Sequence, residues 1–241
     1  NQIRELATGY GRLDAMWFDA GWVCERAGQD IRLGEIIEEV RKIQPGMLCA
    51  DRTIGGPYEN YVTPEQCVPE RPLSIPWESC ITLGTSFSFK YEDEYKSPRQ
   101  VINLLIDIVV KGGNLAINVG PQPDGRLPAG AIRTLKGMGE WLSVYGEAIY
   151  GTRVCAPYKE GNMGFTQKGG TVYAIQSFAD ENDAAENTVW IPYTGEVREV
   201  SALGAGDAAV TSFKKEEGGY RVTLEERRSK RAPIARVFCL R

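Results

Sequence analysis

The 241-residue sequence contains no histidine, and this absence narrows the chemistry open to it. Serine and cysteine hydrolases built on a triad use histidine as the base, and histidine is also the commonest metal ligand. Six cysteines are scattered without a CxxC pair or the spacing of a metal site. We therefore expect no metal and mostly isolated thiols, with one disulfide as the alternative. Any catalysis must depend on carboxylates, lysine or tyrosine.

An excess of positive charge and a long apolar run are also missing. The formal net charge is −4, which argues against a nucleic-acid partner. The longest apolar run, residues 101–110, is interrupted by Asn103 and Asp107 and is shorter than the ~20 residues that span a bilayer. We expect no membrane partner. With 42% hydrophobic and 25% charged residues, the composition is that of a folded globular protein.

Helical and strand patterns alternate in the first part of the chain. The apolar spacing predicts strands at 13–19, 47–50 and 114–119, and helices at 31–43, 98–110 and 129–145. This alternation indicates βα units with a parallel sheet, and strands that end in polar residues are typical of a (β/α)8 barrel. Only about four units are visible, too few to close a barrel. We therefore expect further barrel sequence before residue 1.

The pattern changes near Thr152, where short alternating segments separated by Gly, Asn and Asp turns begin. Such a pattern is typical of an antiparallel β-sandwich. The expected fold class is therefore α/β plus all-β. Residues 1–151 would form the second half of a (β/α)8 TIM-like barrel, and residues 152–241 a small β-sandwich domain.

Two acidic residues stand beside tryptophans at strand positions. Asp19 ends a strand that contains Trp17, although a helix N-cap or a turn would suit an aspartate equally well. Glu78 follows Trp77, and a carboxyl packed against an indole has a raised pKa that suits a general acid. Glu65, in the long loop, is the second candidate, and each glutamate has a surface role as its alternative. Two carboxylates on different barrel strands are the machinery of glycoside hydrolysis.

Arg52 ends the next predicted strand, where a guanidinium can pair with a carboxylate or bind sugar hydroxyls through a forked hydrogen bond. A salt bridge to Asp51 or a surface role is the alternative. Aromatic residues could supply the apolar faces on which sugars stack, although aromatics at these spacings more often belong to a core. They are Trp17, Trp22, Tyr58, Tyr61 and Trp77. This chemistry requires no metal or organic cofactor.

Three segments, in the right order, resemble family 29 α-L-fucosidases. They are residues 17–22 (WFDAGW), residues 76–80 (PWESC) with 84–88 (GTSFS), and residues 112–121 (GGNLAINVGP) with the following Asp124 and Gly125. All lie within residues 1 to about 150, and the β-rich remainder fits the C-terminal sandwich of that family. The sequence of residues 58–66 (YENYVTPEQ) is similar to that of the family branch associated with α-1,3/1,4-linked fucose.

The resemblance implies a retaining exo-α-L-fucosidase that acts on fucosylated oligosaccharides or glycoconjugates. It implies Asp19 as the nucleophile, with Trp17 and Arg52 lining the fucose pocket. Glu78 is the first choice for the acid/base and Glu65 the reserve, and a retaining mechanism sets the two carboxyl groups about 5–5.5 Å apart. The other expected substrate-binding residues are Trp22, Tyr58 and Trp77.

One departure concerns recognition of the sugar. The family binds fucose hydroxyls with histidines from the first half of the barrel, and this chain has none. We therefore expect the N-terminal half of the barrel as a partner, in the same protein or in a separate chain. Family analogy suggests a periplasmic or extracellular location. The alternatives are another retaining barrel glycosidase, a catalytically silent protein that binds fucosylated glycans, and a purely structural fragment.

Overall fold

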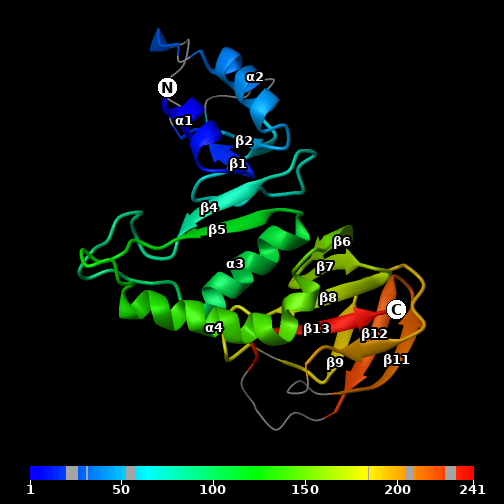
Figure 1. Cartoon of the computed structure of the whole chain (residues 1–241). Coiled ribbons are helices and arrows are strands. Elements are labelled where there is room, and N and C mark those ends of the chain that lie inside the picture. The colour runs from blue at the N-terminus through cyan, green and yellow to red at the C-terminus, as the bar shows by residue number, and fades with distance from the viewer. Residues whose placement is uncertain (20–26, 31, 53–57, 184, 205–208, 226–231) are drawn as a thin grey trace. The chain divides into compact units, whose positions relative to one another are not determined.

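The computed structural model describes residues 1–19, 27–30, 32–52, 58–183, 185–204, 209–225 and 232–241. The chain forms two compact units. The first contains Asn1–Glu65 and Leu73–Glu78, and the second contains Gln66–Pro72 and Ser79–Arg241. Figure 1 shows the elements of each unit along the chain.

The first unit is built on a parallel sheet with the strand order β1-β2-β3. Its elements are α1 (Gln2–Gly9), β1 (Ala15–Trp17), α2 (Leu33–Ile43), β2 (Leu48–Asp51) and β3 (Tyr61–Val62). A parallel bridge joins Val62 to Trp77, directly before β4 (Glu78–Thr82). The predicted strands at 13–19 and 47–50 and the predicted helix at 31–43 are confirmed, each with shorter bounds.

The helices cover one face of this sheet because α2 carries its apolar residues on one side. Ile37 and Val40 are fully buried, and they pack with Ala7 of α1 and Cys49 of β2. Met16 of β1 packs against the same cluster. Since side chains alternate along a strand, the neighbours of Met16 and Cys49 face the opposite side of the sheet. That opposite face carries the candidate site.

The second unit begins with two strands and two helices. They are β4, α3 (Pro98–Val110), β5 (Asn114–Asn118) and α4 (Ala129–Tyr145), and β4 pairs with β5. The predicted start of α3 is confirmed, because Ser97 accepts a hydrogen bond from the Gln100 amide at 3.3 Å and the Gln100 side chain accepts one from the Ser97 amide at 2.8 Å. This capping box with a proline in the first turn fixes where the helix begins.

Eight strands follow and form two antiparallel sheets, which confirms the predicted β-sandwich. The five-stranded sheet has the order β10-β13-β8-β7-β6, and the three-stranded sheet has the order β11-β12-β9. The strands are β6 (Arg153–Glu160), β7 (Met163–Lys168), β8 (Thr171–Ser177), β9 (Thr188–Ile191), β10 (Val200–Ala202), β11 (Val210–Glu216), β12 (Gly219–Leu224) and β13 (Ala235–Leu240).

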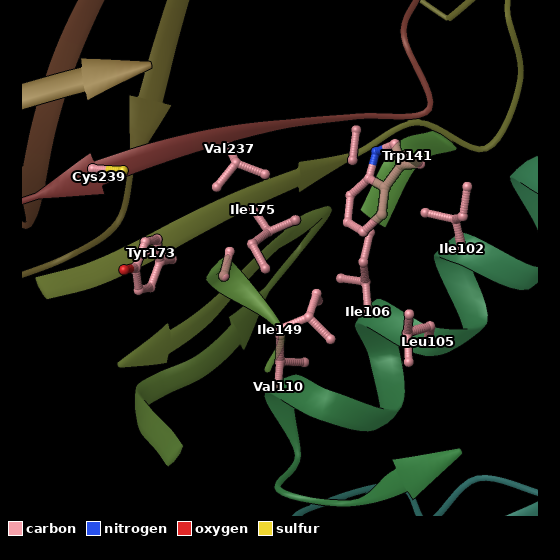
Figure 2. Packing of buried hydrophobic residues seen from close by; sticks show 12 residues of the cluster. Ile102, Leu105, Ile106, Val110, Trp141, Ile149, Tyr173, Ile175, Val237 and Cys239 are labelled. Atoms are coloured by element: carbon pink, nitrogen blue, oxygen red, sulfur yellow. The ribbon is translucent and has the colours of Figure 1, made fainter. Parts of the chain in front are cut away.

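Strand β13 of the five-stranded sheet is buried on both faces. In β13 all six residues are buried, and they alternate between two cores. Val237 packs with Ile175 of β8, Ile106 of α3 and Trp141 of α4, as Figure 2 shows. Phe238 instead packs against the three-stranded sheet. The helices and the sandwich therefore share one compact unit, and the domain boundary at residue 151 stays a prediction.

Among the described residues, Cys49, Cys67, Cys155 and Cys239 carry free thiols, and Cys49, Cys155 and Cys239 are buried. Within the described ranges, no group of three or more Cys, Asp or Glu residues is arranged to hold a metal ion. Of the helices described, none combines the length and the apolar character needed to cross a membrane.

Candidate active site

The strands of the first unit present an aromatic row near their carboxyl ends. Trp17 pairs with Ala50, and Ala50 pairs with Tyr61, so the three residues lie side by side on neighbouring strands. Met16 and Cys49 face the helices, and therefore this row faces away from them. The rings of Trp17 and Tyr61 meet edge to face, with centroids 6.5 Å apart.

The next row with the same orientation contains the charged residues. Asp19, Arg52 and Thr63 each stand two positions beyond the aromatic row. The parallel bridge from Val62 to the residue before Glu78 brings Glu78 to the same level. In a parallel barrel, side chains at the carboxyl ends of adjacent strands converge on one site. The register thus aligns a predicted nucleophile, a predicted sugar-binding arginine and a predicted acid/base.

Arg52 is the centre of this group. Its Nε and Nη2 each donate to Asp19 Oδ1 at 3.2 Å, and its Nη1 donates to the Thr63 carbonyl at 3.2 Å. Nη2 also forms an ion pair with Glu65. The guanidinium carbon lies 5.6 Å from the centroid of the Trp17 ring. The structure therefore brings four predicted site residues together: Asp19, Arg52, Glu65 and Trp17.

The group combines a fixed cation with accessible carboxylates. The Arg52 side chain is 17% exposed, whereas those of Asp19 and Glu65 are 61% and 42% exposed. Burial opposes the charged form of Arg52, but its hydrogen bonds to Glu65 and Asp19 outweigh burial and raise the pKa of the guanidinium. Arg52 is thus a permanent charge that orients both acids, and their remaining oxygens can reach a ligand.

Glu78 lies in a different environment. Burial raises the pKa of its carboxyl, and no ion pair to it is found among the residues that the structure describes. Burial raises the pKa of the Tyr61 hydroxyl as well. The negative charge of Glu78 raises that pKa further, so the two groups interact electrostatically. Such a carboxyl keeps its proton to higher pH than one paired with arginine.

Three further residues were predicted to bind substrate. Two of them lie elsewhere in the unit, and the third is outside the described residues. Trp77 is 1% exposed, so its ring belongs to the interior and offers no open face to a sugar. Tyr58 packs with the helix side of the unit, where its hydroxyl donates to Glu38 Oε1 of α2 at 3.5 Å and its ring occupies the space that a side chain on Gly34 would need. Trp22 lies outside the described residues.

The sequence did not indicate the Thr63 carbonyl as a partner of Arg52. Tyr61 and Val62 form the strand β3 within the long loop that contains Glu65. The β-prone pair Tyr61 and Val62 is the only local signal for this strand, and a strand of two residues is too short to give an alternating pattern.

Parallel strands with an arginine and several acids at their carboxyl ends, followed by a β-sandwich, define the architecture of a barrel-type glycoside hydrolase. The family model described as Alpha-L-fucosidase matches residues 1–147. The chain belongs to the α-L-fucosidase family.

Curated relatives agree with this assignment. An α-L-fucosidase from Branchiostoma floridae is 33% identical over 135 residues, which cover 53% of this chain and 30% of that protein. The tissue α-L-fucosidase of Homo sapiens is 31% identical over 145 residues, covering 56% of this chain and 30% of that protein. The match thus spans about a third of the length of these relatives.

Solved structures cover nearly the whole chain. The α-L-fucosidase isoenzyme 1 from Paenibacillus thiaminolyticus gives a TM-score of 0.83 at 27% identity, over 99% of this chain and 60% of that one. The α-fucosidase from Thermotoga maritima gives a TM-score of 0.79 at 27% identity, over all of this chain and 55% of that one. The predicted fold, part of a barrel followed by a sandwich, is confirmed.

Proposed function

We propose that this chain carries the catalytic carboxylates of a retaining exo-α-L-fucosidase, which releases terminal α-linked L-fucose from oligosaccharides or glycoconjugates. The observation that carries the proposal is the single row of Asp19, Arg52 and Glu78 at the carboxyl edge of parallel strands, in a chain of the α-L-fucosidase family. A solved relative at 26% identity, the Thermotoga maritima enzyme, is in complex with fucose.

Asp19 is the proposed nucleophile. Among the described residues, Arg52 donates to Oδ1 of Asp19 through two nitrogens at 3.2 Å, and Oδ2 is the oxygen proposed to attack the anomeric carbon. In the first step, the bond from Oδ2 to the anomeric carbon forms while the bond to the leaving oxygen breaks, and a glutamic acid protonates that oxygen. In the second step, the same glutamate takes a proton from water, which displaces Asp19 and releases fucose with its configuration retained.

Glu78 is the better candidate for that acid. A general acid must hold its proton before the first step, and the pKa of Glu78 is raised by burial. Glu65 is instead ion-paired with Arg52. We therefore propose Glu78 as the acid/base and Glu65 as a residue that holds the Arg52 guanidinium in place.

The remaining features of the proposal follow from the family resemblance. The segment 58–66 supports α-1,3/1,4-linked fucose as the substrate. The N-terminal half of the barrel is the proposed partner that completes the sugar pocket. A periplasmic or extracellular location is proposed by the same analogy.

Azide rescue tests the roles of the carboxylates in the complete barrel, with p-nitrophenyl α-L-fucoside as the substrate. Asp19→Asn is expected to lower kcat by at least about 10³-fold. Added azide should restore turnover and give the β-fucosyl azide, because azide enters from the face that Asp19 occupied. Azide should also rescue Glu78→Gln, but the product should have the opposite anomeric configuration. It should be the α-fucosyl azide, because azide replaces water in the second step.

Glu70→Gln, in the same loop region as Glu65, is the matched control and should retain full activity. A folded Asp19→Asn variant with normal turnover would exclude Asp19 as the nucleophile. Formation of the α-fucosyl azide by Glu65→Gln, and not by Glu78→Gln, would transfer the acid/base role to Glu65. Hydrolysis of other p-nitrophenyl glycosides in place of the fucoside would favour a different glycosidase.

A further inference from the structure

The β-sandwich contains a cleft of about 450 Å³ beside the edge strand β9. This volume lies within the range of about 300–1,000 Å³ that small-molecule sites occupy. None of the residues lining it belongs to the candidate active site. The polar ones include Glu160, Asn162, Gln176, Glu186 and Arg221, and the largest apolar one is Trp190.

The side-chain oxygen of Gln176 is a buried hydrogen-bond acceptor that has no donor among the described residues. In β8, Ile175 faces the helices, so Gln176 faces the three-stranded sheet and the cleft. Its Oε1 is buried and accepts no hydrogen bond from the described residues. Buried side-chain acceptors are nearly always paired with protein or water. The structure thus has a place for a donor that arrives from the cleft, such as a hydroxyl group.

The walls of the cleft are held by internal hydrogen bonds. Arg236, a buried residue of β13, donates to the carbonyls of Ala185 at 2.9 Å and Glu186 at 2.7 Å. On the other side, the Asn162 carbonyl accepts from the Ser177 amide at 2.9 Å. The backbone that carries Glu186 and Asn162 is therefore fixed, while both side chains remain exposed.

Trp190 adds an aromatic surface. Its ring is 36% exposed on β9, and its cross-strand partner Arg221 lies 5.6 Å from the ring centroid. Arg221 is itself held by Glu216, with three hydrogen bonds of 3.0–3.1 Å. An exposed indole beside carboxylates, amides and a guanidinium matches the two kinds of surface of a pyranose, which has an apolar C–H face and a rim of hydroxyls.

We propose that this cleft is a carbohydrate-binding site for a neutral pyranose unit, separate from the hydrolytic residues. The C–H face of the sugar stacks on Trp190, and one hydroxyl donates to Gln176 Oε1. Glu160 and Glu186 accept from other hydroxyls and disfavour anionic sugars. The charge of Arg221 is already matched by Glu216, so the cleft gives no net attraction to an anion.

Fluorine NMR of the intact 241-residue chain labelled with 5-fluorotryptophan tests this proposal. The signal of Trp190 is identified by its absence in Trp190→Phe. The chain is titrated with lactose, chitobiose and methyl α-L-fucoside as neutral sugars. At least one should shift the Trp190 signal saturably, with a Kd of about 1 mM. Gln176→Met, which keeps the length and removes the acceptor, should weaken that binding about tenfold or more.

Phe213→Ala is the matched control, because Phe213 is also 36% exposed and lies on the three-stranded sheet but does not line the cleft. It should leave the affinity unchanged, and thermal unfolding confirms that each variant is folded. No shift with any of the three sugars would overturn the proposal. So would an equal affinity in Gln176→Met, or a response to putrescine alone, which would indicate a cation site. Asp19→Asn leaves this readout intact, so its outcome is independent of hydrolysis.

Discussion

Asp107 should stabilise the second unit by joining α3 to the sandwich. Its Oδ2 lies 2.8 Å from Nζ of Lys111, the C-cap residue of α3, and its Oδ1 lies 2.6 Å from Nζ of Lys159 on β6. The side chain of Lys111 is 8% exposed and that of Asp107 is 26% exposed. Replacing Asp107 with Asn keeps the shape and one acceptor but leaves the buried Lys111 ammonium without a counter-charge.

The size of the effect follows from this partial burial. Breaking a buried ion pair from one side costs about 3–5 kcal/mol, whereas breaking an exposed pair costs about 0–1 kcal/mol. Lys111 is nearly inaccessible, but Asp107 reaches solvent and Lys159 is more exposed still. We therefore expect Asp107→Asn to lower the free energy of unfolding by about 2 kcal/mol at neutral pH.

The effect should depend on pH in a defined direction. Burial opposes the charged form of Asp107, but its hydrogen bonds to Lys111 and Lys159 prevail and lower its pKa below the ordinary 3.8. A carboxyl with a lowered pKa in the folded state contributes its stability above its unfolded pKa. The difference between the two proteins should therefore be complete at neutral pH. It should shrink as the pH falls below 3.8 and through the folded pKa.

Urea denaturation followed by tryptophan fluorescence measures this difference, because Trp141 is part of the core that α3 shares with the sandwich. Glu196→Gln is the control, since it breaks an exposed pair with Lys215 in the same unit and should have no measurable effect. The explanation by partial burial is wrong if Asp107→Asn is no more destabilising than this control. It is equally wrong if the cost of Asp107→Asn persists unchanged in acid.

Three further predictions concern single side chains. Arg52→Lys should lower kcat/KM of the active enzyme about 10²-fold, because one ammonium cannot hold Asp19, Glu65 and the Thr63 carbonyl together. Steady-state kinetics measure this loss, and unchanged kinetics would contradict the role of Arg52. Ser97→Ala should cost about 1 kcal/mol in urea denaturation through loss of the α3 cap, and an unchanged midpoint would refute that role. Glu78→Gln should raise the free energy of unfolding at neutral pH and not below pH 4.5, because burial penalises the folded carboxylate only above its ordinary pKa; the same titration at both pH values checks the sign.

The local signals in the sequence were sufficient for most helices. Pro98 after a serine predicted the start of α3, and the spacing of apolar residues predicted α2 and α4. Asp19 and Arg52 were identified because each follows an apolar strand, and the carboxyl ends of parallel strands must share an edge. These predictions needed no knowledge of distant contacts.

Other features depend on contacts that no local pattern contains. For Tyr58 and Trp77 the sequence left a sugar-stacking role and a core role open; Tyr58 packs with the cluster of α2, and Trp77 is buried in the interior. β13 belongs to the short alternating segments from which the sandwich was predicted, and such alternation does not indicate a strand that is buried on both faces. Which partners cover its two faces became known only from the packing of Val237 against the helices and Phe238 against the other sheet.

The choice between Glu65 and Glu78 shows why register matters more than sequence distance in this site. Glu65 is closer to Arg52 in sequence and forms the ion pair. Glu78 reaches the same row only through the bridge between Val62 and Trp77 and is held where burial penalises its charge. A half-buried acid without an ion-pair partner among the described residues destabilises the fold at neutral pH, so packing alone gives no reason for a glutamate there. Proton transfer to a leaving group gives one, because only a carboxyl that is costly to ionise carries its proton into the reaction.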